Sequence, residues 1–119
     1  MDENSILTDV KAHLGITQDD ESFDTILVDD INTTFMILYQ LGVGPVFSIS
    51  GKDSTWKDYL KDQSDLTAIR TYLYMRVRLM FDPPQNGSVL EALKSQIAEL
   101  EWRLHIACDP RNTFSEESS

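Results

Sequence analysis

The chain has 119 residues, 41% of them hydrophobic and 9% aromatic, and its formal net charge is −10 from twenty acidic and ten basic residues. This length suits one domain, and the apolar fraction is that of a folded protein rather than a disordered one. The negative charge disfavours binding to nucleic-acid phosphates and to anionic membranes. The acids are concentrated at the N-terminus, because residues 1–30 hold nine acidic residues and one lysine.

We find neither a secretion signal nor a membrane-spanning segment in the sequence. The N-terminus, Met1-Asp2-Glu3-Asn4, is acidic, whereas a signal peptide begins with basic residues. The longest apolar run, residues 35–39, is far too short to cross a bilayer. Cys108 is the only cysteine, so no disulfide forms within the chain. We therefore expect a protein that is soluble and cytoplasmic at synthesis, without a membrane partner.

Apolar residues at helical spacing predict two helices in the first half of the chain. The first covers residues 5–14, with Asn4 or Ser5 as its N-cap and Gly15 as its C-cap. Its apolar face consists of Ile6, Val10 and Leu14. The second covers residues 22–41, and its stripe consists of Leu27 or Val28, Ile31, Phe35 and Leu38. From residue 35 to 41 this helix is apolar nearly all round, which predicts burial on most sides.

Residues 45–55 have a different pattern, in which apolar residues alternate with serines before Gly51. This pattern predicts a short extended segment or a protruding loop. An extended segment must pair its backbone groups with another part of the chain or with a second subunit. Residues 55–60 are predicted to form a short helical turn.

The second half of the chain predicts a long antiparallel helix pair. One helix covers residues 64–81, and Asp82-Pro83-Pro84 ends it because proline donates no backbone hydrogen bond. Its stripe consists of Leu66, Ile69, Leu73, Val77 and Met80. The other helix is predicted to start with a capping box, Ser88-Val89-Leu90-Glu91. Its heptad-like stripe consists of Leu90, Leu93, Ile97, Leu100 and Leu104.

These elements predict an all-α fold, a small bundle of about four helices. We expect one helical domain over residues 1–108 and a flexible, polar tail over residues 109–119. No catalytic arrangement, cofactor site or metal site is predicted. His13 and His105 are single histidines on separate helices, and His105 with Cys108 would supply only two metal ligands. An enzyme is therefore disfavoured.

Basic and aromatic side chains alternate on the helix over residues 64–81. Arg70, Tyr74 and Arg78 form one line, and Tyr72 and Arg76 flank it. Such a face can bind single-stranded nucleic acid, stay solvated, or anchor a protein interface. We favour a subunit interface, in which acidic residues of a neighbouring copy face these arginines.

The acidic side of that interface includes Asp29 and Asp30, whose carboxylates point about 100° apart and do not converge on one metal. Trp102 lies off the leucine stripe of the last helix, and we include it among the interface residues. The sequence leaves open whether Trp102 widens the core or is an exposed anchor.

The block from Arg76 to Arg103 resembles the tailed-phage head–tail connector family, also described as adaptor or head-completion proteins. The resemblance rests on an arginine- and leucine-rich helix, the Asp82-Pro83-Pro84 stop, and the final Glu99-Leu100-Glu101-Trp102-Arg103-Leu104. Two N-terminal motifs, residues 6–11 and Gly42-Val43-Gly44-Pro45, extend it over most of residues 5–106.

The resemblance implies a virion protein at the head–tail junction, assembled in the host cytoplasm. It implies a homo-oligomeric ring, expected to be a dodecamer, that docks under the portal protein. Such a ring extends the DNA channel, helps to retain packaged DNA without sequence-specific binding, and offers a surface to the next connector, stopper or tail protein. The C-terminal tail would reach the portal, with Arg111 and Phe114 as its anchors.

One alternative function keeps the same charge and fold class. A small acidic helical regulator would bind a host protein or mimic DNA to block a nuclease. It would stay a monomer or dimer and have no affinity for a portal ring.

Overall fold

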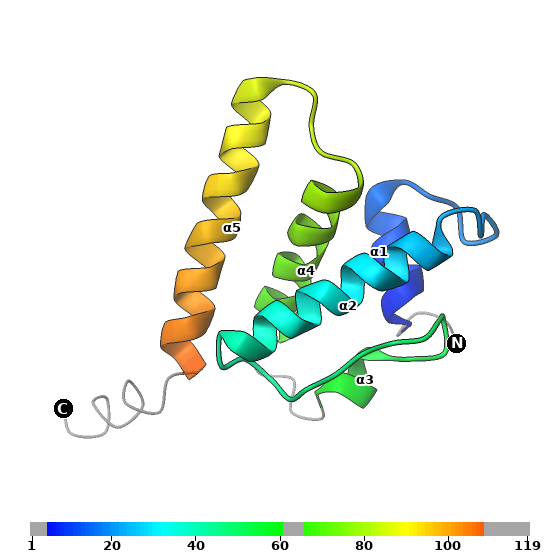
Figure 1. The fold of residues 1–119 in the computed structure, drawn as a ribbon, viewed down its shortest axis with the longest axis horizontal. Helices are drawn as coiled ribbons and strands as arrows, with labels where there is room; N and C mark the ends of the chain where they lie inside the picture. Colours follow the sequence, from blue (N-terminus) through cyan, green and yellow to red (C-terminus); the bar gives the residue numbers. More distant parts are fainter. Residues whose placement is uncertain (1–4, 61–65, 109–119) are drawn as a thin grey trace.

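The computed structural model describes residues 5–60 and 66–108, and in these ranges the chain is helical without a β-strand. The helices are α1 (Ile6–Leu14), α2 (Asp24–Gln40), α3 (Trp56–Tyr59), α4 (Leu66–Phe81) and α5 (Gly87–Cys108). Helices α4 and α5 run side by side, and α2 crosses in front of α1 and α4 (Figure 1). The predicted all-α bundle with a C-terminal helix pair is confirmed, with the turn predicted at residues 55–60 present as α3.

Helix α1 has the predicted ends. The Ser5 hydroxyl accepts a hydrogen bond from the Thr8 amide at 3.3 Å, and Gly15 closes the helix with a left-handed φ of 79°. Ile6 and Val10 are fully buried, whereas Leu14 is half-buried. The buried face packs against α2 and α4, so α1 is fixed by its apolar side.

Helix α2 buries the predicted stripe, since Leu27, Ile31, Phe35 and Leu38 are all inaccessible. The prediction that its second half is buried on most sides is wrong. The side chains of Met36 and Tyr39 are 54% and 52% exposed. The reason is that α2 lies on the outside of the bundle, with neighbours on one face only (Figure 1). The apolar composition of residues 35–41 therefore places hydrophobic groups on the subunit's surface.

The segment between α2 and α3 is extended and lies against the core, with Val43 and Ile49 buried. The Asn32 side-chain amide takes the place of a neighbouring strand. Its Nδ2 donates to the Ile49 carbonyl at 2.9 Å, and its Oδ1 accepts from the Ile49 amide at 2.7 Å. Farther along, the Ile6 amide donates to the Ser54 carbonyl at 3.0 Å. These backbone groups are thus satisfied within the subunit.

The extended segment also closes an aromatic cluster under α2. The ring of Phe35 lies 4.6 Å from that of Tyr59 and 5.2 Å from that of Phe47. Gly44 permits this packing, because its φ is 73° and a Cβ there would collide with the Tyr59 hydroxyl. The cluster attaches the segment to the bundle at spacings that favour aromatic pairs.

Two details of the α4–α5 pair differ from the predictions. Tyr72 is fully buried although it lies outside the predicted stripe, and Met80 at the helix end is 37% exposed. The predicted capping box at Ser88 is wrong, because the Asn86 side chain accepts from the amides of Ser88 and Val89 at 2.8 and 3.1 Å. Asparagine before Gly87 therefore starts α5.

The predicted leucine stripe of α5 is only partly buried. Ile97 and Leu104 are buried, while Leu90, Leu93 and Leu100 remain half-buried. Of the predicted α4 stripe, the Leu66 side chain lies outside the described residues. The partial burial leaves apolar surface along the α4–α5 seam.

Candidate assembly surfaces

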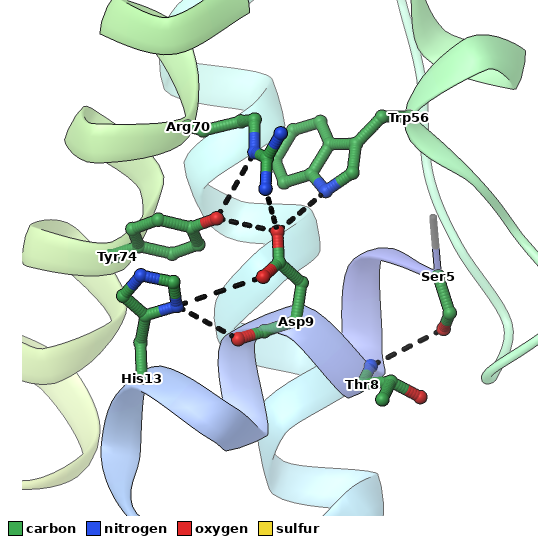
Figure 2. Close-up of polar contacts among 7 residues, drawn as sticks. All are labelled: Ser5, Thr8, Asp9, His13, Trp56, Arg70 and Tyr74. Carbon is green, nitrogen blue, oxygen red and sulfur yellow. Dashed lines mark hydrogen bonds and ion pairs between the residues drawn. The ribbon is translucent and has the colours of Figure 1, made fainter. Parts of the chain in front are cut away.

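The strongest polar constellation of the subunit surrounds the Asp9 carboxylate on α1 (Figure 2). One oxygen, Oδ2, accepts hydrogen bonds from Trp56 Nε1 at 2.9 Å, Arg70 Nη2 at 2.8 Å and the Tyr74 hydroxyl at 2.5 Å. The His13 ring stacks on Tyr74 with centroids 3.6 Å apart. This carboxylate therefore joins α1, α3 and α4 at one point, the Asp9 junction.

The environment of the Asp9 junction keeps Tyr74 neutral and Arg70 positively charged. Burial, followed by the hydrogen bond to Asp9, raises the pKa of Tyr74 to about 12. Burial works to lower the pKa of Arg70, but its bonds to Tyr74 and Asp9 outweigh burial and raise that pKa. The guanidinium also lies 5.4 Å from the Trp56 ring centroid, within cation–π range. The junction thus holds a neutral phenol between a carboxylate and a cation.

A second polar group ties α4 to α5. The Tyr72 hydroxyl donates to Glu101 Oε2 at 2.7 Å, and Arg76 Nη1 lies 3.6 Å from the same oxygen. Burial and the bond to Glu101 raise the pKa of Tyr72 above its usual range. The Nε of Arg76 is buried and has no hydrogen-bond partner among the described residues.

A third polar contact is the buried Lys11 on α1. Its ammonium donates to Asp24 Oδ1 at 2.9 Å and to the Gln18 carbonyl at 3.1 Å. The Lys11 side chain is only 4% exposed and that of Asp24 is 30% exposed, so this pair joins the last turn of α1 to the first turn of α2 at the edge of the core. Sequence reasoning missed both Lys11 and Asp9, because their partners lie far along the chain or in loops.

The structure sorts the predicted interface residues into two groups. Arg70, Tyr74 and Arg76 have the partners described above within the subunit. The others face solvent fully or in part: Arg78, Trp102, Asp29 and Asp30. Trp102 is 65% exposed, so it does not widen the core. Arg111 and Phe114 lie outside the described residues, and the role predicted for them stays a prediction.

No group of three or more potential metal ligands occurs among the residues that the structure describes. The Nδ1 atom of His105 lies 3.0 Å from the carbonyl oxygen of Leu41, the C-cap residue of α2. Within residues 5–60 and 66–108, no helix has the length and hydropathy needed to cross a membrane.

Residues 6–111 match the family model described as "Phage connector protein". The chain belongs to this family, so the predicted resemblance is confirmed. Comparison with curated proteins and with solved structures found no match. The protein is thus a structural component of the phage connector that interacts with other head or tail proteins in the virion.

Proposed function

We propose that this protein forms a homo-oligomeric ring, a dodecamer, that docks under the phage portal. The observation that carries the proposal is the family match over residues 6–111. A cyclic ring requires two different surfaces on each subunit that meet head to tail. The uncovered acidic face of α2 and the basic residue Arg78 on α4 are suitable candidates for those surfaces.

In this proposal the ring extends the portal's DNA channel and helps to retain the packaged genome. The net charge of −10 supports a channel that DNA passes without adhering, because like charges repel the phosphate backbone. The far side of the ring offers a docking surface to the next connector, stopper or tail protein. The role is structural rather than enzymatic.

We place portal contact on the tail over residues 109–119, with Arg111 and Phe114 as anchors. Arginine is among the residue types that most often anchor interfaces, and phenylalanine is enriched in interface cores. Truncation after residue 108 should abolish portal binding and leave the helical domain folded, as measured by circular dichroism.

Native mass spectrometry of the full chain, alone and with the purified portal ring of the same phage, tests this function. We expect many copies of the chain to join each portal ring. A monomer or fixed dimer that ignores the portal would contradict the connector role and favour the acidic regulator. Variant Lys57→Glu, which changes an exposed residue of α3, should join the portal ring as the wild type does, and shows that a change of surface charge alone does not abolish binding.

A further inference from the structure

Apolar surface remains uncovered along the seam between α4 and α5, on the side that α1 borders. Three adjoining hollows of about 280, 270 and 200 Å³ follow this seam and share the side chain of Gln96. We call this surface the α4–α5 groove. Its lining includes Thr71, Met75, Arg78, Leu93, Gln96 and Leu100, and at one end the ion pair between Glu99 and Arg103. The leucines here belong to the α5 stripe that is only half-buried within the subunit.

A second uncovered surface runs along the outside of α2, and we call it the α2 ridge. It consists of Ile26, Asp29, Asp30, Thr33 and Met36, which recur at helical spacing. Ile26 and Met36 are 52% and 54% exposed. The helix carries three aspartates and no basic residue, so the α2 ridge is both apolar and acidic.

The α2 ridge and the α4–α5 groove face away from each other. Helices α2 and α4 pack together, and each has its own buried face. At 100° per residue, Met75 and Arg78 lie about half a turn around α4 from the buried Ile69 and Leu73. Asp29 and Met36 likewise lie far from the buried stripe of α2. Two unlike surfaces on opposite sides of a subunit suit a head-to-tail contact between copies.

The charges on these two surfaces are complementary. Arg78 is exposed and has no ion-pair partner among the described residues, whereas Arg70, Arg76 and Arg103 each have one. On the α2 ridge, Asp29 and Asp30 have no cation partner in the same ranges. Burial and the neighbouring charge of Asp29 raise the pKa of Asp30, so an approaching cation would relieve repulsion there.

The spacing of the residues on the two surfaces is compatible with such a contact. Asp29 and Met36 are seven residues apart, about 10.5 Å along a helix. Arg78 and Thr71 are seven apart on α4, and Leu93 and Leu100 are seven apart on α5. Arg78 and Leu93 line the same hollow, and Thr71 and Leu100 line another. When Asp29 lies beside Arg78 and α2 runs antiparallel to α4 of the next copy, Met36 reaches the hollow that Thr71 and Leu100 line.

We infer that the α2 ridge of one copy seats in the α4–α5 groove of the next, with Asp29 and Asp30 facing Arg78. This inference rests on the proposed ring and names the surfaces that build it. The apolar ends of the ridge supply buried area, and the aspartate–arginine contact fixes the direction of assembly.

Charge reversal tests the contact with two complementary variants. Variant Arg78→Glu alters only the groove, and the double variant Asp29→Arg/Asp30→Arg alters only the ridge. Each should raise the concentration needed for half-assembly by about tenfold or more, as sedimentation velocity would measure. An equimolar mixture should assemble again beyond dimers, because each altered surface then meets an oppositely charged one.

Control variants change charges outside both surfaces. Reversals at exposed sites outside both surfaces, Lys57→Glu and Asp53→Arg, should assemble as the wild type does. Circular dichroism melts should show that all variants fold. Normal assembly of either variant alone, or a mixture that stays disassembled or stops at dimers, would overturn the ridge-and-groove contact while the ring itself stands. A wild-type chain that assembles neither alone nor on the portal would overturn the proposed function as well.

Discussion

The Asp9 junction and the Arg78 region of the α4–α5 groove each contain an arginine of α4, and the two regions differ in how the arginine's charge is satisfied. At the Asp9 junction, Arg70 finds a carboxylate 2.8 Å away within its own subunit. Two turns later on the same helix, Arg78 has no such partner among the described residues. The comparison teaches that helical spacing alone does not separate an arginine that holds the fold from one that is free for a partner. The two arginines differ in their position relative to α1, since Arg70 reaches Asp9 on that helix and Arg78 does not.

The largest expected effect comes from neutralising the Asp9 junction. Variant Asp9→Asn removes the charge that three donors share, and the free energy of unfolding should fall by about 3 kcal/mol, because an arginine loses its buried counter-charge. Urea unfolding followed by circular dichroism measures the change. The matched variant Asp29→Asn, on the α2 ridge, should alter stability by less than about 0.5 kcal/mol. Equal effects of the two variants would refute the distinction between the two regions.

A somewhat smaller effect is expected at the buried ion pair between α1 and α2. Variant Lys11→Met keeps the aliphatic stem but leaves Asp24 without its partner, and should cost about 2 kcal/mol of stability. Variant Lys52→Met changes an exposed lysine that has no ion-pair partner among the described residues, and should be nearly neutral. Thermal unfolding of the two variants side by side gives the comparison; a Lys52 effect as large as that of Lys11 would contradict it.

Alkaline pH should weaken the Asp9 junction. The pKa of Tyr74 is raised to about 12 in the folded state, against 10.0 for the free side chain. Between these values the unfolded chain releases the phenol proton first, so the tyrosine's contribution to stability is complete below pH 10 and is lost as pH rises toward 12. Variant Tyr74→Phe should show a shallower decline of the unfolding free energy over this range. An unchanged slope would show that Tyr74 titrates normally.

The smallest effect on stability is expected for substitution of Trp102. The fluorescence of this side chain can instead report whether the protein assembles. Because Trp102 is 65% exposed and Trp56 is buried, iodide should quench only the fluorescence of Trp102 in the free subunit. Trp102→Phe should change the free energy of unfolding by less than about 0.5 kcal/mol. If Trp102 belongs to a subunit interface, assembly should protect it from iodide. Quenching that is identical before and after assembly would remove Trp102 from the interface.

Local sequence signals predicted much of the fold. Ser5 and Gly15 bound α1, and the stripe from Leu27 to Leu38 is buried, because capping and amphipathic spacing act within a few residues. The misplaced start of α5 has a local cause too. Asn86 and Ser88 are both good N-caps, and only the backbone geometry selects between them.

The candidate surfaces were less accessible to sequence reasoning. Asp9 meets its three donors at separations of 47, 61 and 65 residues, which no helical periodicity predicts. Asn32 replaces a strand partner for Ile49 through one side chain. The exposure of Met36 depends on α2 having neighbours on one side only. Tertiary placement, rather than residue type, therefore decides which arginines have a partner within the chain and which apolar residues stay exposed.

The central claim is that copies of this chain form a closed connector ring. Electron cryo-microscopy of the full chain bound to its portal ring tests it most directly. We predict a closed ring of copies under the portal, with α2 of each copy against the α4–α5 groove of the next. Isolated copies scattered on the portal, or a bare portal at saturating protein, would contradict the claim.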